Sequence, residues 1–131
     1  MAFNDSSLWF ASDDPISGLS TSTTEIETVP NFSPFVTICF IPQLVTVEIV
    51  ERANLLTNAV INIGTNSPNY NNIASAQIVG GVLGSLQGLN VSTDMPKLEP
   101  GTVIYCKVTT AATHLGSGEC SFRPIVTGIL V

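Results

Sequence analysis

The segment 97–131, KLEPGTVIYCKVTTAATHLGSGECSFRPIVTGILV, constrains the fold more than any other part of the sequence. Thr102–Thr110 and Ser121–Val131 are rich in β-branched and aromatic residues, which favour strands. The intervening Ala111–Glu119 contains two glycines, which favour a turn, so we predict a C-terminal hairpin. Because an apolar strand that ends the chain must pair its backbone N–H and C=O groups, we expect the C-terminus to be built into a sheet.

Short apolar segments separated by turn-forming residues continue through the middle of the chain. Strands are predicted at Phe35–Phe40, Leu44–Glu51 and Ala59–Thr65. Val45, Val47 and Ile49 alternate with more polar residues, as expected of a strand with one buried face. Pro42 is expected to end a strand or to mark a sheet edge, because it has no backbone N–H to donate.

Two segments leave their secondary structure open. Ala53–Leu56 fits either one helical turn or a continuation of the preceding strand. Ile73–Leu89 has a helical apolar stripe, but its glycines each cost about 1 kcal/mol in a helix interior. We therefore favour two short strands around a glycine turn, with a short helix at Ile73–Val79 as the alternative. The whole pattern predicts an all-β, antiparallel β-sandwich of jelly-roll-like character at residues 35–131.

Residues 1–34 differ in composition from the rest of the chain. They hold five of the ten acidic residues and no basic residue, and they are rich in Ser, Thr and Pro. We predict an extended acidic N-terminal arm over this range. Phe3, Trp9 and Phe10 are its candidate inter-subunit contacts, although Trp9 could equally pack on the sheet of its own domain.

The low charge of the chain indicates that much of its surface is covered by other molecules. Charged residues make up 11% of the sequence, against about 25% in an average soluble domain. The mean hydropathy is +0.40, yet no apolar run approaches the roughly 20 residues of a membrane helix. We therefore expect an oligomer or a larger particle, and no membrane.

The basic residues and the cysteines exclude further classes. The four Lys and Arg residues are too few and too scattered for a nucleic-acid surface. Cys39, Cys106 and Cys120 have no metal-binding spacing. Cys106 and Cys120 could face each other across the predicted hairpin, but we favour buried reduced thiols in a protein made in a cytosol, since no signal peptide is recognisable.

No motif in the sequence indicates catalysis. His114 is the single histidine, and no G-x-S-x-G elbow accompanies it. Asp13-Asp14 lacks the EF-hand pattern, and no glycine-rich element has the pattern of a phosphate loop. We therefore predict no enzyme, no cofactor and no metal. Tyr70 and His114 are the candidate side chains of exposed recognition loops.

The last two-thirds of the chain, about residues 59–131, resembles a known group of proteins. The segments that carry the resemblance are NIGT (Asn62–Thr65), LEPGTVIYCKVTTAAT (Leu98–Thr113) and IVTGILV (Ile125–Val131). Their order is similar to that in β-sandwich domains of tailed-bacteriophage virion proteins, which include capsid decoration (cement) proteins, head fibres and tail-fibre tips. The resemblance implies a trimeric or otherwise symmetric virion component, with a homotrimer as the expected form, that is assembled in the host cytoplasm and has no catalytic residues.

Two functions follow as expectations from this resemblance. The first is a capsid decoration protein that binds the major capsid protein between capsomers and stabilises the head. The second is a head-fibre or tail-fibre module that recognises the host surface through Tyr70 and His114. A fibre usually carries a shaft of repeats, and the sequence shows none, so decoration is favoured.

Overall fold

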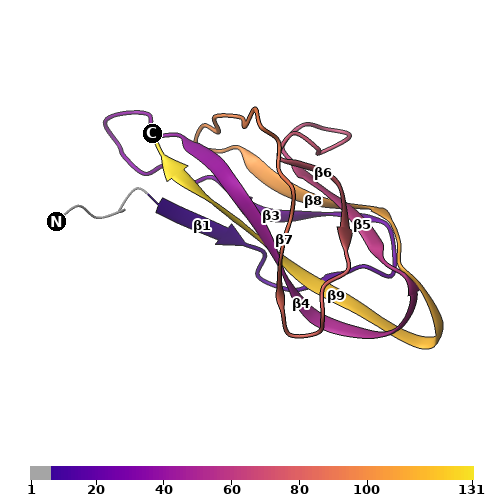
Figure 1. Cartoon of the computed structure of the whole chain (residues 1–131). Helices are drawn as coiled ribbons and strands as arrows, with labels where there is room; N and C mark the ends of the chain where they lie inside the picture. Colours follow the sequence, from indigo (N-terminus) through magenta and orange to yellow (C-terminus); the bar gives the residue numbers. More distant parts are fainter. Residues whose placement is uncertain (1–6) are drawn as a thin grey trace.

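The structure is a computed structural model that describes residues 7–131, which form nine β-strands and no helix (Figure 1). The strands are β1 (Ser7–Ala11), β2 (Ile16–Ser17), β3 (Ser22–Thr28), β4 (Phe40–Thr57), β5 (Ala59–Gly64), β6 (Ala74–Val79), β7 (Leu86–Gly88), β8 (Val103–Thr110) and β9 (Thr113–Leu130). Two antiparallel sheets pack against each other around one apolar core, so the predicted all-β sandwich is confirmed. Among these residues no helix has the length and apolar character needed to cross a membrane.

Sheet A has the strand order β1-β9-β4-β7, with β2 also paired to β9, and sheet B has the order β3-β8-β5-β6. The two longest strands, β4 and β9, form a ladder from Phe40↔Leu130 to Thr57↔Thr113. The ladder continues at the end of the chain, where Val131 and Cys39 exchange two backbone hydrogen bonds of 2.9 Å. The prediction that the C-terminus is built into a sheet is therefore confirmed.

The predicted C-terminal hairpin is wrong, because β8 and β9 lie in different sheets. β8 pairs with β3 and β5, whereas β9 pairs with β1, β2 and β4. The link between them is Ala111-Ala112, and the buried Ala112 donates a hydrogen bond of 2.8 Å to the carbonyl of Gly18. Thr113 already pairs with β4, so the glycine-containing segment continues β9. Strand propensity locates a strand but does not choose its partner.

Strand pairing also crosses the predicted boundary between residues 34 and 35. β1 and β2 pair with β9, and β3 pairs with β8, so residues 7–28 belong to the sandwich and do not form a separate arm. Their apolar residues Phe10, Ile16 and Ile26 are buried in the core. The acidic and hydroxyl residues between them concealed this pattern: Asp13 and Asp14 lie in the bend between β1 and β2, and Glu25 is exposed on the edge strand β3.

The segment before β4 differs from the predicted strand at Phe35–Phe40. Phe35 is 92% exposed in a loop, and the strand begins at Phe40, which is fully buried. Pro42 does not end this strand: it lies inside β4, where a register shift between Pro42 and Leu44 accommodates the missing N–H.

Most of the remaining strand predictions are confirmed. Val45, Val47 and Ile49 point into the core, and β4 continues through Ala53–Leu56, so the alternative of a helical turn is wrong there. Ile73–Leu89 contains the two short strands β6 and β7, and the alternative of a helix is wrong there too. These two strands belong to opposite sheets, because the intervening segment crosses the edge of the sandwich.

Candidate interaction surfaces

The outer face of sheet A carries a row of side chains that runs across three strands. Trp9 in β1 is paired with Thr127 in β9, and Thr127 is paired with Leu44 in β4. Residues directly opposite each other in antiparallel strands point to the same side of the sheet. Trp9 is 64% exposed and Leu44 is 47% exposed, so this row faces outward.

Apolar side chains also occupy the neighbouring rows. In the row on one side of Trp9, Ile129 is paired with Ile41. In the row on the other side, Ile125 is paired with both Ala11 and Thr46. We call the combined surface the apolar face: Trp9, Ala11, Ile41, Leu44, Thr46, Ile125, Thr127 and Ile129. It contains no charged residue, although antiparallel sheets that face water usually alternate apolar inner residues with polar outer ones.

The apolar face ends at an ion pair between β9 and β4. Arg123 and Glu48 lie 3.0 Å apart and are both partly exposed. Arg123 also donates to the backbone carbonyls of Ser12 (3.2 Å) and Asp13 (3.3 Å). These bonds hold the bend between β1 and β2, so the guanidinium fixes the position of β1 at the sheet edge.

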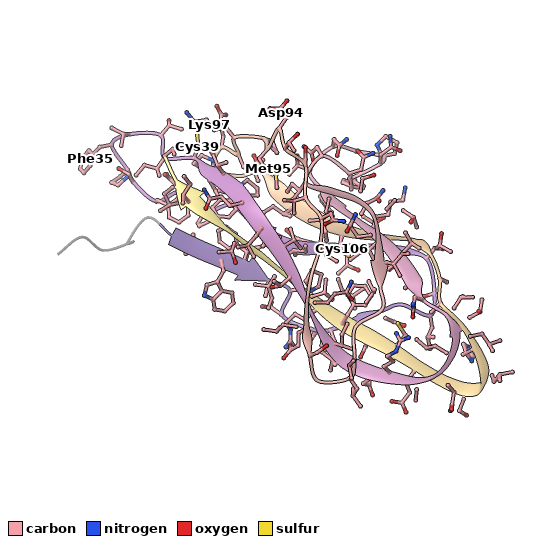
Figure 2. The ribbon with its side chains drawn as sticks, in the orientation of Figure 1. Phe35, Cys39, Asp94, Met95, Lys97 and Cys106 are labelled. Carbon is pink, nitrogen blue, oxygen red and sulfur yellow. The ribbon has the colours of Figure 1, made fainter. Side chains whose placement is uncertain are left out.

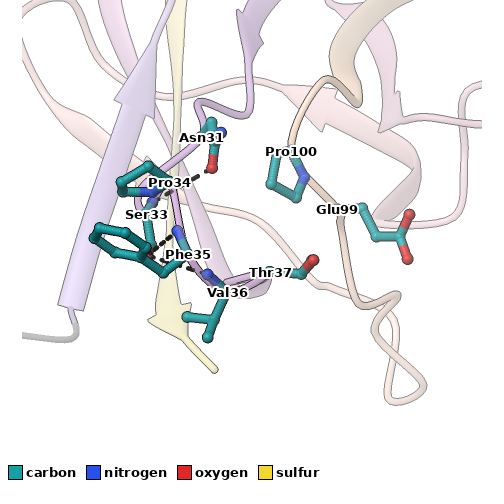
Figure 3. A pocket seen from close by; sticks show the side chains of 8 residues that line it. All are labelled: Asn31, Ser33, Pro34, Phe35, Val36, Thr37, Glu99 and Pro100. Atoms are coloured by element: carbon teal, nitrogen blue, oxygen red, sulfur yellow. Dashed lines mark hydrogen bonds between the residues drawn. The ribbon is translucent and has the colours of Figure 1, made fainter.

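A second exposed apolar site lies in the loop before β4 (Figure 3). The Ser33 hydroxyl accepts hydrogen bonds from the backbone N–H groups of Phe35 (3.1 Å) and Val36 (3.3 Å). The loop and the segment Glu99-Pro100 border a hollow, and Phe35 lies at the far end of the molecule, away from the core (Figure 2). The turn thus presents an aromatic side chain in a defined position to solvent.

The loop 66–72 folds over the outer face of sheet B and places Tyr70 against Tyr105. The centroids of the two rings are 4.7 Å apart. Gly64, paired with Tyr105, makes this possible, because a Cβ at this glycine would collide with the backbone of Tyr70 and Asn71. Tyr70 has a φ of 50°, a left-handed conformation that is uncommon for a large side chain.

Side-chain amides hold this loop in place. The Asn66 Oδ1 atom accepts the backbone N–H groups of Asn71 (2.8 Å) and Asn72 (3.1 Å). The Asn72 amide in turn bonds twice to Thr65. The Asn62 side chain donates to the Asn69 carbonyl at 3.0 Å. The loop is therefore preorganised, and Tyr70 is half-buried rather than fully exposed as a recognition side chain.

His114, the second predicted recognition residue, is exposed in β9 of sheet A. Its Nδ1 atom lies 2.9 Å from the carbonyl oxygen of Gly116, and since a carbonyl accepts, Nδ1 carries the proton. Tyr70 lies on sheet B, and no bond or ring contact within residues 7–131 joins it to His114. The structure therefore does not unite the two residues into one site.

The predicted inter-subunit contacts are placed differently from one another. Phe3 lies outside the described residues. Trp9 is exposed on the apolar face, whereas Phe10 is 8% exposed and packs in the core, so it cannot act as a contact in the folded domain. The apolar face itself was not predicted from the sequence. A signal for it was present, because Ile125 and Ile129 alternate with buried apolar residues, so this strand is apolar on both of its faces.

The three cysteines are buried and free, which confirms the prediction of unpaired thiols. Burial raises the pKa of the Cys106 thiol to about 12. Burial also raises the pKa of Cys120, against the opposing effects of the Arg52 charge and a hydrogen bond from Gly18. Neither group is therefore an activated nucleophile. Within residues 7–131 no group of three or more His, Cys, Asp or Glu side chains is placed to hold a metal ion.

Comparison with known proteins found no match to any protein-family model, curated protein or solved structure.

Proposed function

We propose that the protein is a structural protein of a virus particle, a capsid decoration protein that stabilises an assembled phage head. It binds between capsomers, and the major capsid protein is its partner. The observation that carries the proposal is the apolar face, where Trp9 is 64% exposed and none of the eight residues is charged. A contiguous apolar patch of this kind is typical of a docking surface.

The scaffold behind this face suits a docking role. Phe40, Phe122 and Val126 are fully buried behind the three strands that carry it, so the face is rigid. A rigid surface binds without losing much conformational entropy. Each contact with a shell needs only modest affinity, because many identical sites act together. The resemblance of residues 59–131 to virion β-sandwich domains supports the same role.

Co-sedimentation with empty phage shells tests the proposal. Wild-type protein should pellet with shells to saturation at micromolar concentration. Leu44→Lys places a charge at the β4 end of the central row of the apolar face and should weaken binding at least about tenfold. Ile78→Lys is the matched control, because Ile78 is 58% exposed on β6 of sheet B, outside the apolar face.

Two results would contradict the proposal. One is the absence of co-sedimentation at micromolar wild-type protein, and the other is an equal loss of binding in the two lysine variants. The resemblance also implies a homotrimer, and light scattering on the purified protein measures this.

A second candidate function is a head-fibre or tail-fibre module that recognises the host surface. The observation that favours it is the preorganised loop that holds Tyr70 in a left-handed conformation beside Tyr105. Backbone strain that the surrounding bonds maintain is often found at binding sites. Labelled protein should then adsorb to host cells, and Tyr70→Ala should abolish adsorption. His114→Ala tests the other predicted loop separately, and wild-type protein that does not adsorb contradicts this function.

A further inference from the structure

The edges of the two sheets differ in how they are protected against pairing with other strands. An edge strand exposes unpaired N–H and C=O groups, and proteins usually blunt it with charges, bulges or short length. β3 carries Glu25 and Glu27, with a register shift between them. β7 has three residues. Each of these edges therefore has a recognisable protective feature.

The edge formed by β6 is protected by its neighbours. Gln87 donates a hydrogen bond of 2.7 Å to the Ile78 carbonyl, and the Asn90 N–H donates to the Gln77 side chain at 2.9 Å. Ala76 has a φ of 52°, which interrupts the regular strand. A new strand could not align along this edge without breaking these contacts.

β1 has none of these protective features. Its sequence, SLWFA, contains no charged residue, proline or glycine. Its five residues pair with β9 in unbroken register. Within residues 7–131, the backbone groups of Leu8–Ala11 form no hydrogen bond with a strand other than β9. β1 is therefore a regular and uncharged edge.

We infer that β1 pairs antiparallel with β1 of a second copy of this chain, about a two-fold axis at Trp9. In this register Ser7 lies opposite Ala11 and Leu8 lies opposite Phe10, while the two Trp9 residues lie opposite each other. The inference goes beyond the proposed function, because it concerns a contact between copies and not with a shell.

A second copy fits this edge because an antiparallel pair about a two-fold axis is self-complementary. Like charges opposite each other would destabilise such a pair, and β1 contains none. Asp13 and Asp14 lie in the bend beyond the end of β1, and the bonds from Arg123 to the backbone hold that bend. The pairing also joins the apolar faces of the two copies, since the Trp9 side chains meet on the outer side.

The contact closes on itself as a dimer, because each copy uses the same strand. It differs in this respect from the homotrimer that the resemblance implies, which would need two different surfaces on each copy. The oligomeric state therefore separates the two arrangements.

Sedimentation velocity of the full chain from micromolar to millimolar concentration tests the inference. Wild-type protein should dimerise reversibly. Trp9→Lys places two charges opposite each other at the axis and should raise the dimer dissociation constant at least about tenfold. Leu44→Lys lies on the same face but in β4, away from the edge, and should change the constant less than about twofold.

Oxidative cross-linking gives a second readout that also captures a weak dimer. Residues directly opposite each other in an antiparallel pair have Cβ atoms about 4.5–5.5 Å apart, within reach of a disulfide after a small adjustment. Trp9→Cys should therefore form a covalent dimer, and Leu44→Cys should not. The native thiols do not interfere, because all three are buried.

A chain that stays monomeric at millimolar concentration overturns the inference, and so does a trimer. An equal rise of the dimer dissociation constant in Trp9→Lys and Leu44→Lys also overturns it, because the contact would then lie on the apolar face rather than at the edge. Failure of the proposed function is a separate result, because an absence of co-sedimentation with shells does not change the self-association of the protein.

Discussion

The ring of Phe10 in β1 lies edge-on against the ring of Phe40 in β4, with centroids 4.9 Å apart and an interplanar angle of 69°. The strand β9 separates β1 from β4 in the sheet, so the two rings meet beneath it. They can do so because Gly128, in β9, has no side chain, and the ring of Phe40 fills the space that a Cβ would take. This contact anchors the N-terminal segment in the core.

Phe10→Ala should lower the free energy of unfolding by about 3–5 kcal/mol, because it leaves a cavity beside Phe40. Trp9→Ala replaces the adjacent, exposed residue and should change the free energy of unfolding by less than about 0.5 kcal/mol. Urea unfolding followed by circular dichroism measures both. If Trp9→Ala lowered the free energy of unfolding more than Phe10→Ala, then Trp9 and not Phe10 would face the core, which would contradict this orientation of β1.

Gly128→Ala should also destabilise the protein, by about 1–3 kcal/mol, because the new methyl group would collide with the Ile41 carbonyl and the Phe40 ring. Gly88→Ala is the matched control within sheet A. No atom lies within 4 Å of the Cβ position at Gly88, so this variant should be neutral or slightly more stable. Thermal unfolding of the two variants measures this difference in stability, and equal melting temperatures would contradict the crowding at Gly128.

Asn66→Ala should loosen the loop that carries Tyr70. It removes the acceptor of the Asn71 and Asn72 N–H groups. Both bonds are exposed, so water can replace the lost acceptor, and each bond should contribute no more than about 0.5–1.5 kcal/mol. Hydrogen exchange at these two amides should therefore become faster, while exchange in β4 stays unchanged. Asn69→Ala is the control, and retained protection in Asn66→Ala would contradict the role of this side chain.

The stability of the protein should fall at high pH because of Cys106. Burial raises the pKa of this thiol from 9.0 to about 12, so the folded state keeps the proton while the unfolded chain loses it. The contribution is fully present below pH 9 and is lost between about pH 9 and 12, at up to about 1.4 kcal/mol per pH unit.

Urea midpoints measured from pH 7 to pH 11 test this sign. Cys106→Val keeps an apolar side chain without a titrating group, and its midpoint should fall less steeply over the same range. The raised pKa of Cys120 acts in the same direction, so the variant should retain part of the decline. If the urea midpoint of the wild-type protein increased as the pH is raised beyond 9, this would contradict the burial of these thiols.

Sequence reasoning located the strands of the middle region well. The alternation of Val45, Val47 and Ile49 with more polar residues identified the buried side of β4, because side chains in a strand point to opposite faces in turn. The same reasoning failed at Phe35, where the local apolar run indicated a strand and the chain instead forms a turn on the Ser33 hydroxyl.

The sequence by itself determined the fold class, the burial of the cysteines and the incorporation of the C-terminus, because periodicity, composition and unmet backbone groups are local properties. The pairing of strands was decided by the tertiary structure. β8 and β9 separate into different sheets, and Trp9, Thr127 and Leu44 from three distant segments meet in one row. The physical reason is that a β-strand takes its hydrogen-bond partners from anywhere in the chain, so a surface built across strands exists only once the whole sandwich has packed.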